Sequence, residues 1–274
     1  MDVATVKAKL GDELWKASTS GSIANIESYT SHQHTLDPSY KAPFQDIISA
    51  ATMKDHVDVV KYCLQQGATV DHNVMAFLIT NESMETHKVL VDAKAIPIDH
   101  YIPWFGTILS VAATDGLYEW TKFCLEAGAD PNKDKVDEEL SVLASAAGNG
   151  HLDIVRLLLD NGAELKDSGA IVQAADAGEK DAVALLLERG ADIDEIGIKN
   201  ATDKRVTAKM SRALHKAVKA GHMDVVRLLL EKGANINLTD VRGRTPLALA
   251  REEGRAELIE ALENCGGEIK EAST

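Results

Sequence analysis

Two segments of the chain are nearly identical over fourteen residues. Gly150–Ala163 reads GHLDIVRLLLDNGA and Gly221–Ala234 reads GHMDVVRLLLEKGA, and looser copies begin at His56 and Gly116. Each copy shows an apolar helical pattern followed by a glycine that would end the helix. One such unit cannot bury its own apolar face. The copies are therefore expected to stack on their neighbours around one continuous core.

Aligning the copies on their last glycine divides the 274 residues into eight units. The closing positions are Gln33, Gly67, Lys94, Gly128, Gly162, Gly190, Gly233 and Gly266. Twelve residues before each of these lies a second column: Gly21, Asp55, Glu82, Gly116, Gly150, Gly178, Gly221 and Gly254. This middle column predicts a tight turn between antiparallel helices, where a positive φ favours glycine. Four positions earlier, seven of the eight units have alanine, which allows neighbouring helices to pack closely.

The family that these patterns resemble is the ankyrin repeat, through the repeated G-H-x-D-[IV]-V-R-L-L-L-x-x-G-A, the triplet Thr245-Pro246-Leu247 and a spacing near 33 residues. The resemblance covers Leu10 to Gly267. It implies an all-α solenoid of about eight helix-turn-helix repeats, with first helices lining a concave groove and hairpin fingers between the repeats. It also implies structural hydrogen bonds for His151, His215 and His222. We expect a single domain over 1–274, with repeats at approximately 10–33, 44–67, 72–94, 105–128, 139–162, 168–190, 210–233 and 243–266.

The spacing between units is uneven. The intervals between closing positions are 34, 27, 34, 34, 28, 43 and 33 residues, so two fingers are expected to be short and one carries an insert over 195–212. The insert holds five basic residues in an acidic protein: Lys199, Lys204, Arg205, Lys209 and Arg212. It is interpreted either as a loop that contacts a partner or as a solvated surface excursion.

The net charge of −14 argues against nucleic acid and anionic membranes as partners and favours cationic or neutral ones. No apolar run approaches the length of a membrane helix, and the N-terminal segment is too charged for a signal peptide. A cytoplasmic location is expected, with the nucleus as an alternative. The three cysteines match no zinc pattern, and no phosphate-binding loop, dinucleotide fingerprint or hydrolase motif is present. Neither a metal nor a cofactor is therefore expected.

The two halves of the chain differ in composition. All twelve aromatic residues lie at or before Phe123, six of the nine histidines lie in the first hundred residues, and all nine arginines lie at or beyond Arg156. The first four repeats therefore look specialised, whereas the last four look like regular scaffold.

The specialised residues gather on the connections of repeats 1–4. Loops with so many aromatic residues usually cover an apolar part of the fold or bind a partner. The candidate binding residues are His34, Asp37, Tyr40, Phe44, Asp71, His72, Asp99, His100, Tyr101, Trp104 and Phe105. If this surface is catalytic, its candidates for acid–base chemistry are Asp71, His72, His100 and Tyr101.

Two functions remain open on this evidence. The first is an intracellular binding protein that presents its groove and fingers to another protein or peptide. The second is a site for a small hydrophobic molecule, with the chain acting as a cofactor-independent cyclase, isomerase or dehydratase. The protein-binding function is preferred because the resemblance implies it, and the enzyme assignment is left uncertain.

Overall fold

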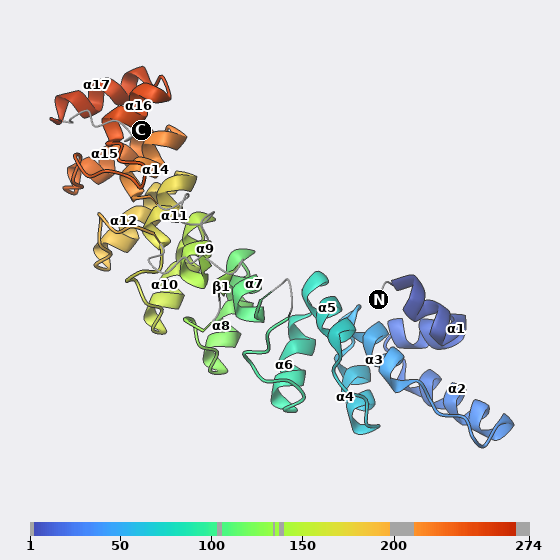
Figure 1. The fold of residues 1–274 in the computed structure, drawn as a ribbon. Helices are drawn as coiled ribbons and strands as arrows, with labels where there is room; N and C mark the ends of the chain where they lie inside the picture. The colour runs from blue at the N-terminus through green and yellow to red at the C-terminus, as the bar shows by residue number, and fades with distance from the viewer. Residues whose placement is uncertain (1–2, 103–105, 134, 137–139, 198–210, 267–274) are drawn as a thin grey trace. The chain divides into compact units, whose positions relative to one another are not determined.

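The structure is a computed structural model, which describes residues 3–102, 106–133, 135–136, 140–197 and 211–266. Its contacts group into two compact units, unit 1 (Met1–Pro103) and unit 2 (Trp104–Thr274). Both units consist almost entirely of helices that pair with their neighbours along the chain (Figure 1). The all-α fold is thereby confirmed, while the single domain over 1–274 and the number of repeats stay predictions.

Unit 1 contains three helix pairs within its described residues. These are α1 (Val3–Thr19) with α2 (Ile23–Leu36), α3 (Phe44–Thr52) with α4 (Val57–Gln65), and α5 (His72–Thr80) with α6 (Met84–Asp92). Helix α3 packs against both α1 and α5, and α4 packs against both α2 and α6. First helices therefore stack on first helices and second helices on second helices.

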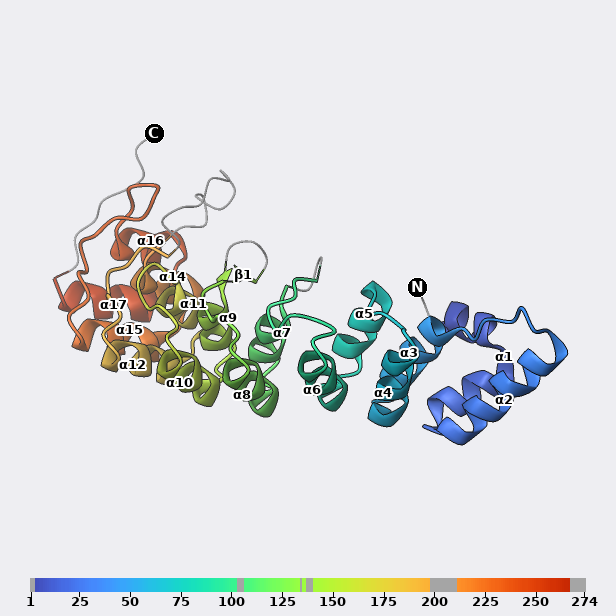
Figure 2. The ribbon, with the colours of Figure 1, turned by 90° about the horizontal axis from the view of Figure 1, so that it is seen from below.

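Unit 2 follows the same rule. Its pairs are α7 (Ile108–Thr114) with α8 (Tyr118–Glu126), α9 (Val142–Gly148) with α10 (Leu152–Asp160), α11 (Ala170–Ala177) with α12 (Lys180–Glu188), α14 (Ala213–Ala220) with α15 (Met223–Glu231), and α16 (Pro246–Glu252) with α17 (Ala256–Asn264). Figure 2 shows the first helices of this unit along one side and the second helices along the other. A short antiparallel ribbon of β1 (Lys135–Val136) and β2 (Leu140–Ser141) precedes α9.

The core follows the columns found in the sequence. Six of the seven column alanines are completely buried, and Ala17 is 5% exposed. Leu158, in the apolar run of α10, is also completely buried. The short side chains bring successive first helices into close contact, and the apolar runs fill the space between the two layers.

The middle column adopts a positive φ in all eight turns, as predicted. Five of its glycines lie between 73° and 88° and Gly254 lies at 65°, while Asp55 and Glu82 adopt 53° and 50° without being glycine. At the closing position Lys94 does the same at 53°. A side chain with a Cβ is strained in this region by about 1–2 kcal/mol. The three exceptions all belong to unit 1.

The first pair departs from the expected range of 10–33. Helix α1 begins at Val3 and is kinked at Gly11, where φ is 72° and ψ is 166°. Helix α2 continues through Gln33 to Leu36. Gln33 is a good helix former in a position where other units have a glycine that stops the helix, so the helix runs on by about one turn.

Of the insert predicted over 195–212, the structure describes only the two ends, 195–197 and 211–212. Ile196 pairs with Arg212 in an antiparallel bridge, and Gly197 N donates to Ser211 O at 3.3 Å. The buried carboxylate of Glu195 accepts hydrogen bonds from Gly169 N and Asp167 N at the start of α11. Burial raises the pKa of Glu195, and these two hydrogen bonds oppose the shift. The basic residues at 199, 204, 205 and 209 lie outside the described residues.

Candidate binding surface

The first connection of unit 1 is shorter than expected, because both ends of the predicted finger are helical. His34 lies in the last turn of α2 and Phe44 is the first residue of α3. The ring of Phe44 contacts Tyr62 edge to face, with the ring centroids 5.8 Å apart. Burial raises the pKa of the half-buried Tyr40. This side of the predicted surface is therefore partly packed against the unit itself.

The loop itself begins at Asp37, whose carboxylate accepts hydrogen bonds from the Ser39 backbone N at 2.9 Å and hydroxyl at 2.7 Å. The hydrogen bonds to Ser39 lower the pKa of Asp37. Asp37 is fully exposed and its carboxylate shapes a local turn. Leu36, immediately before it, is 68% exposed, which is unusual for a large apolar side chain.

The second connection is formed around a helix cap. Asp71 is the N-cap of α5, and its Oδ1 accepts from Asn73 N at 2.9 Å and Val74 N at 3.0 Å. Its Oδ2 accepts from the Asn73 amide at 3.2 Å. These bonds account for Asp71 structurally, because an N-cap carboxylate satisfies backbone donors that the helix leaves unpaired. His72 is the first residue of α5, and its side chain is exposed.

The third connection presents the most exposed aromatic side chain among the described residues of the surface. Tyr101 is 56% exposed, and it follows a turn in which His100 N donates to Pro97 O at 3.1 Å. Asp99 and His100 are half-buried in the same turn, while Ile102 is buried and holds the segment to the unit. Trp104 and Phe105 lie outside the described residues.

The C-terminal histidines have the structural roles that the resemblance implied. Nε2 of His151 lies 3.0 Å from Thr114 O, that of His222 lies 3.0 Å from Asp176 O, and that of the buried His215 lies 3.0 Å from Arg244 O. Burial lowers the pKa of His215. His56 makes the same contact as His151, with Nε2 at 2.7 Å from Thr19 O. His56, His151 and His222 each bind a carbonyl of the preceding helix pair, so they connect one pair to the next.

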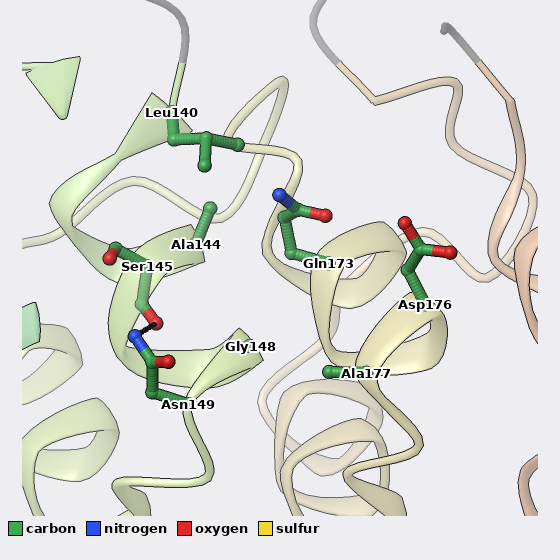
Figure 3. Close-up of a pocket in the computed structure, with 8 residues that line it drawn as sticks. All are labelled: Leu140, Ala144, Ser145, Gly148, Asn149, Gln173, Asp176 and Ala177. Atoms are coloured by element: carbon green, nitrogen blue, oxygen red, sulfur yellow. Dashed lines mark hydrogen bonds between the residues drawn. The ribbon is translucent and has the colours of Figure 1, made fainter. Parts of the chain in front are cut away.

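Unit 2 contains a polar pocket that the sequence analysis missed. It has a volume of about 280 Å³ and lies between α9 and α11 (Figure 3). Asn149 and Ser145 line it from α9 and the turn that follows, and Gln173 and Asp176 line it from α11. The space exists because Ala144, Gly148 and Ala177 have little or no side chain. Every other unit has a residue with a larger side chain at the position of Gly148, two residues after the alanine column, and this departure is the signal that could have revealed the pocket.

Unit 1 contains a second cavity, of about 450 Å³, between α1 and α2. Lys16 and Ser20 line it from the side of α1, and Tyr29 and His32 line it from α2. It does not include the predicted finger residues. No group of three or more His, Cys, Asp or Glu side chains in the described part of the chain is arranged to hold a metal.

The cysteines are unsuited to nucleophilic chemistry where they are buried. Cys63 and Cys124 are completely buried, and burial raises the pKa of the Cys63 thiol to about 12. A thiol with so high a pKa carries almost no reactive thiolate at neutral pH. Both therefore act as small apolar side chains of α4 and α8.

Comparison with known proteins agrees with this architecture. The family model for ankyrin repeats in three copies matches residues 109–197 and 195–272. An ankyrin repeat protein of Rickettsia bellii is 26% identical over 144 residues, which cover 43% of this chain and 39% of that relative. The chain thus spans about two fifths of the length of this curated relative. Among the described helices, none is both long enough and apolar enough to cross a membrane. The repeated helix pairs, their recurring turns and the family match together show that this chain belongs to the ankyrin-repeat family.

Proposed function

We propose that this ankyrin-repeat chain binds another protein or peptide, and that the connections of unit 1 form the binding surface. Ankyrin repeats are protein-interaction modules, which makes protein binding the function of the chain at the coarse level. The surface consists of Asp37, Tyr40, His72, His100 and Tyr101, with His34 beside it and the neighbouring Trp104 and Phe105 continuing it in sequence.

The observation that carries this proposal is the exposure of Tyr101. A tyrosine that is 56% exposed on a connection offers a large apolar ring together with a hydroxyl group. Tyrosine is among the residues that contribute most to protein interfaces, because its ring buries a large area with little loss of conformational entropy. The exposed Leu36 at the end of α2 adds apolar surface in the same unit. Phe44 and Asp71 have structural roles next to this surface. Phe44 packs on Tyr62, and Asp71 caps α5.

The proposal is tested by crosslinking followed by affinity measurement. A photo-crosslinking amino acid at position 101 identifies the partner by mass spectrometry, and calorimetry with the purified partner then compares variants. Tyr101→Ala should weaken binding by about 30-fold, since an interface hot spot contributes about 2 kcal/mol. Its melting temperature should change little, because an exposed side chain contributes little to the core.

Val241→Ala is the matched control, because Val241 is 51% exposed on a connection of unit 2. It should leave the affinity unchanged. Equal losses for Val241→Ala and Tyr101→Ala would contradict a binding surface in unit 1, and so would full affinity of Tyr101→Ala.

The alternative is a small-molecule site that supports acid–base chemistry without a cofactor. The cavity between α1 and α2 supports this alternative, because Tyr29, His32 and Lys16 line it. The finger residues that remain candidates for proton transfer are His72, His100 and Tyr101, since Asp71 is engaged as a helix cap. A small molecule that binds unit 1 in a His32-dependent manner would support this alternative.

A further inference from the structure

Successive helix pairs of unit 2 are connected by donors at one repeated position. Before α10, α15 and α17, the residue that precedes the second helix reaches back to the end of the first helix of the preceding pair. His151 and His222 donate there through Nε2–H to Thr114 O and Asp176 O, and Arg255 donates to Lys219 O at 3.1 Å. Each side chain lies against a middle-column glycine: a Cβ built on Gly116 would be 2.6 Å from the His151 ring, and one on Gly178 would be 2.7 Å from the His222 ring.

Glu179 interrupts this series. A Cβ built on Gly150 would lie 2.5 Å from Glu179 Oε2, so a carboxylate occupies the place that the imidazole rings take elsewhere. A carboxylate is an acceptor only. The carbonyl that corresponds to those of Thr114 and Asp176 belongs to Gly148, the last residue of α9. Among the described residues, no group donates a hydrogen bond to this carbonyl, and no cation pairs with Glu179.

The pocket between α9 and α11 adjoins this interruption, because Gly148 lines it. Three of its polar side chains carry an oxygen to which no group of the described residues donates. The Asn149 amide nitrogen donates to Ser145 O at 3.0 Å and to Thr114 O at 3.3 Å, and no group of the described residues donates to its Oδ1. Lys216 Nζ binds Asp176 Oδ2 at 2.8 Å and leaves Oδ1 without a donor among the described residues. The Gln173 side chain, which Figure 3 shows extending towards α9, makes no hydrogen bond within them.

The charged side chains in and beside the pocket sum to one negative charge, which a single cation would neutralise. Asp176 and Lys216 neutralise each other, and Glu179 adds one uncompensated negative charge. The carboxyl end of α9 contributes further negative potential, because its carbonyl dipoles point outwards there. The chain as a whole carries −14, so a cationic partner is attracted rather than repelled.

We propose that the pocket between α9 and α11 binds the guanidinium group of an arginine side chain from the partner protein. Arginine presents five N–H donors in a rigid plane and no acceptor, which complements a pocket with acceptor oxygens on Asn149, Gln173 and Asp176. Gly148 has no side chain and Ala177 has only a methyl group, which leaves room in the pocket for that plane. This inference deepens the proposed protein-binding function and rests on it. It places a specificity subsite in unit 2, apart from the surface around Tyr101.

The direct test is an NMR titration of the full chain with N-acetyl-arginine methylamide. We expect saturable shifts at the side-chain amides of Asn149 and Gln173 and at the backbone amides of Gly148 and Gly150, with a dissociation constant on the order of millimolar for so small a probe. N-acetyl-citrulline methylamide has nearly the same shape without the charge and should bind at least about tenfold more weakly, because charge-assisted hydrogen bonds are about twice as strong as neutral ones. Equal binding of citrulline or of the lysine analogue would overturn the arginine assignment.

Two variants locate the effect. Glu179→His restores the donor found in the other turns and should weaken binding of the arginine probe by about tenfold or more, since it removes the uncompensated charge. Asp181→His makes the same charge change on an exposed residue two positions away in α12 and should leave the titration unchanged. Equal losses in both variants would show that the probe responds to net charge alone and would overturn the proposal.

The outcome is separable from that of the protein-binding proposal. Tyr101→Ala should leave the arginine titration unchanged, because the probe does not need the unit 1 surface. A chain that binds the arginine probe as expected while Tyr101→Ala keeps full affinity for its partner would retain the subsite and lose the unit 1 surface. A chain with the Tyr101 effect but no shifts at Asn149 and Gln173 would lose the subsite alone.

Discussion

At the scale of single residues, the middle-column glycines serve two purposes that can be separated by mutation. Gly178 has a φ of 83°, which a side chain resists, and a Cβ there would also lie 2.7 Å from His222 Nδ1. The closing glycine Gly162 has a φ of 89° and nothing within 4 Å of a built Cβ. The two positions therefore share backbone strain and differ in the contact with the next helix pair.

Gly162→Ala should lower the free energy of unfolding by about 1–2 kcal/mol through backbone strain alone. Gly178→Ala should cost at least about 1 kcal/mol more, because the methyl group displaces the His222 ring and its hydrogen bond to Asp176 O. Urea denaturation measures both changes. In a His222→Ala background the excess cost of Gly178→Ala should disappear, and its persistence would contradict the steric explanation.

The sequence predicted positions of this kind well, because glycine has few other reasons to recur at one place in a repeat. It predicted the turns at Asp55 and Glu82 from their register alone, and both adopt a positive φ. The sequence also contained the signal for the Asp71 cap, because an aspartate immediately before a helical segment is a typical N-cap. Asp71 was interpreted as a functional residue instead. The Glu179 interruption could not be found in the same way, since a carboxylate at an exposed turn is ordinary until its contact with Gly150 is known.

At the scale of elements, α6 is the helix that departs most from the repeat in its core. Thr86 and His87 take the places that Ile154 and Val155 occupy in α10, and both are completely buried. Burial lowers the pKa of His87 to about 4. A histidine in an unfolded chain has a pKa of about 6.5, so the unfolded state takes up a proton more readily than the folded one.

Unit 1 should therefore lose stability as the pH falls from about 6.5 to about 4, by up to roughly 3 kcal/mol if His87 alone is responsible. The contribution of His87 is fully retained above pH 6.5, because the residue is neutral in both states there. Urea denaturation at a series of pH values, with hydrogen exchange to locate the change in α5 and α6, measures this dependence.

His87→Val should flatten the pH dependence, since it places the common residue of the column in α6. Leu90→Val is the control: Leu90 is completely buried in the same helix, and its loss of volume should cost about 1 kcal/mol at every pH. A pH dependence that survives His87→Val would assign the effect to another group.

The boundaries of the elements were less predictable than their existence. Helices α4, α10 and α15 each end two residues before the glycine that closes the unit. Helix α2 runs on past Gln33 because nothing in the sequence stops it before Asp37. The residues at the connections were the least predictable, since the burial of Tyr40 and the contact of Phe44 with Tyr62 depend on tertiary packing that the repeat pattern does not encode.

At the scale of the whole molecule, the two units should differ in stability. Unit 1 carries three non-glycine residues at positive φ and two buried polar residues in α6. Among the described residues of unit 2, Asp167 alone is a non-glycine at positive φ, and the regular turns are formed by glycines. In repeat arrays stability is approximately a sum of terms for each repeat and each contact between neighbours. The summed free energy of unfolding should therefore be larger for unit 2 than for unit 1.

Hydrogen exchange should show this difference directly. The amides of α9 to α15 should exchange last, and those of α1 to α6 should exchange first, because local opening is governed by the nearest contacts. Leu158→Ala in α10 should cost about 2–5 kcal/mol and accelerate exchange in unit 2. Uniform protection along the chain would contradict a weaker unit 1.

The contacts through His151, His222 and Arg255 also determine how such an array can lengthen during evolution. Each contact begins in one helix pair and ends in the pair before it, so copying a pair joins a duplicated donor to a duplicated acceptor. A tandem copy of α14 and α15 would set His222 against the carbonyl of Lys219, where Arg255 now binds, and the new junction would be complete. A tandem copy of α11 and α12 would set the Glu179 carboxylate against the carbonyl of Asp176, with no proton between two acceptors. Duplication of α14 and α15 is therefore tolerated, whereas duplication of α11 and α12 is opposed. The difference lies in the residue before each second helix.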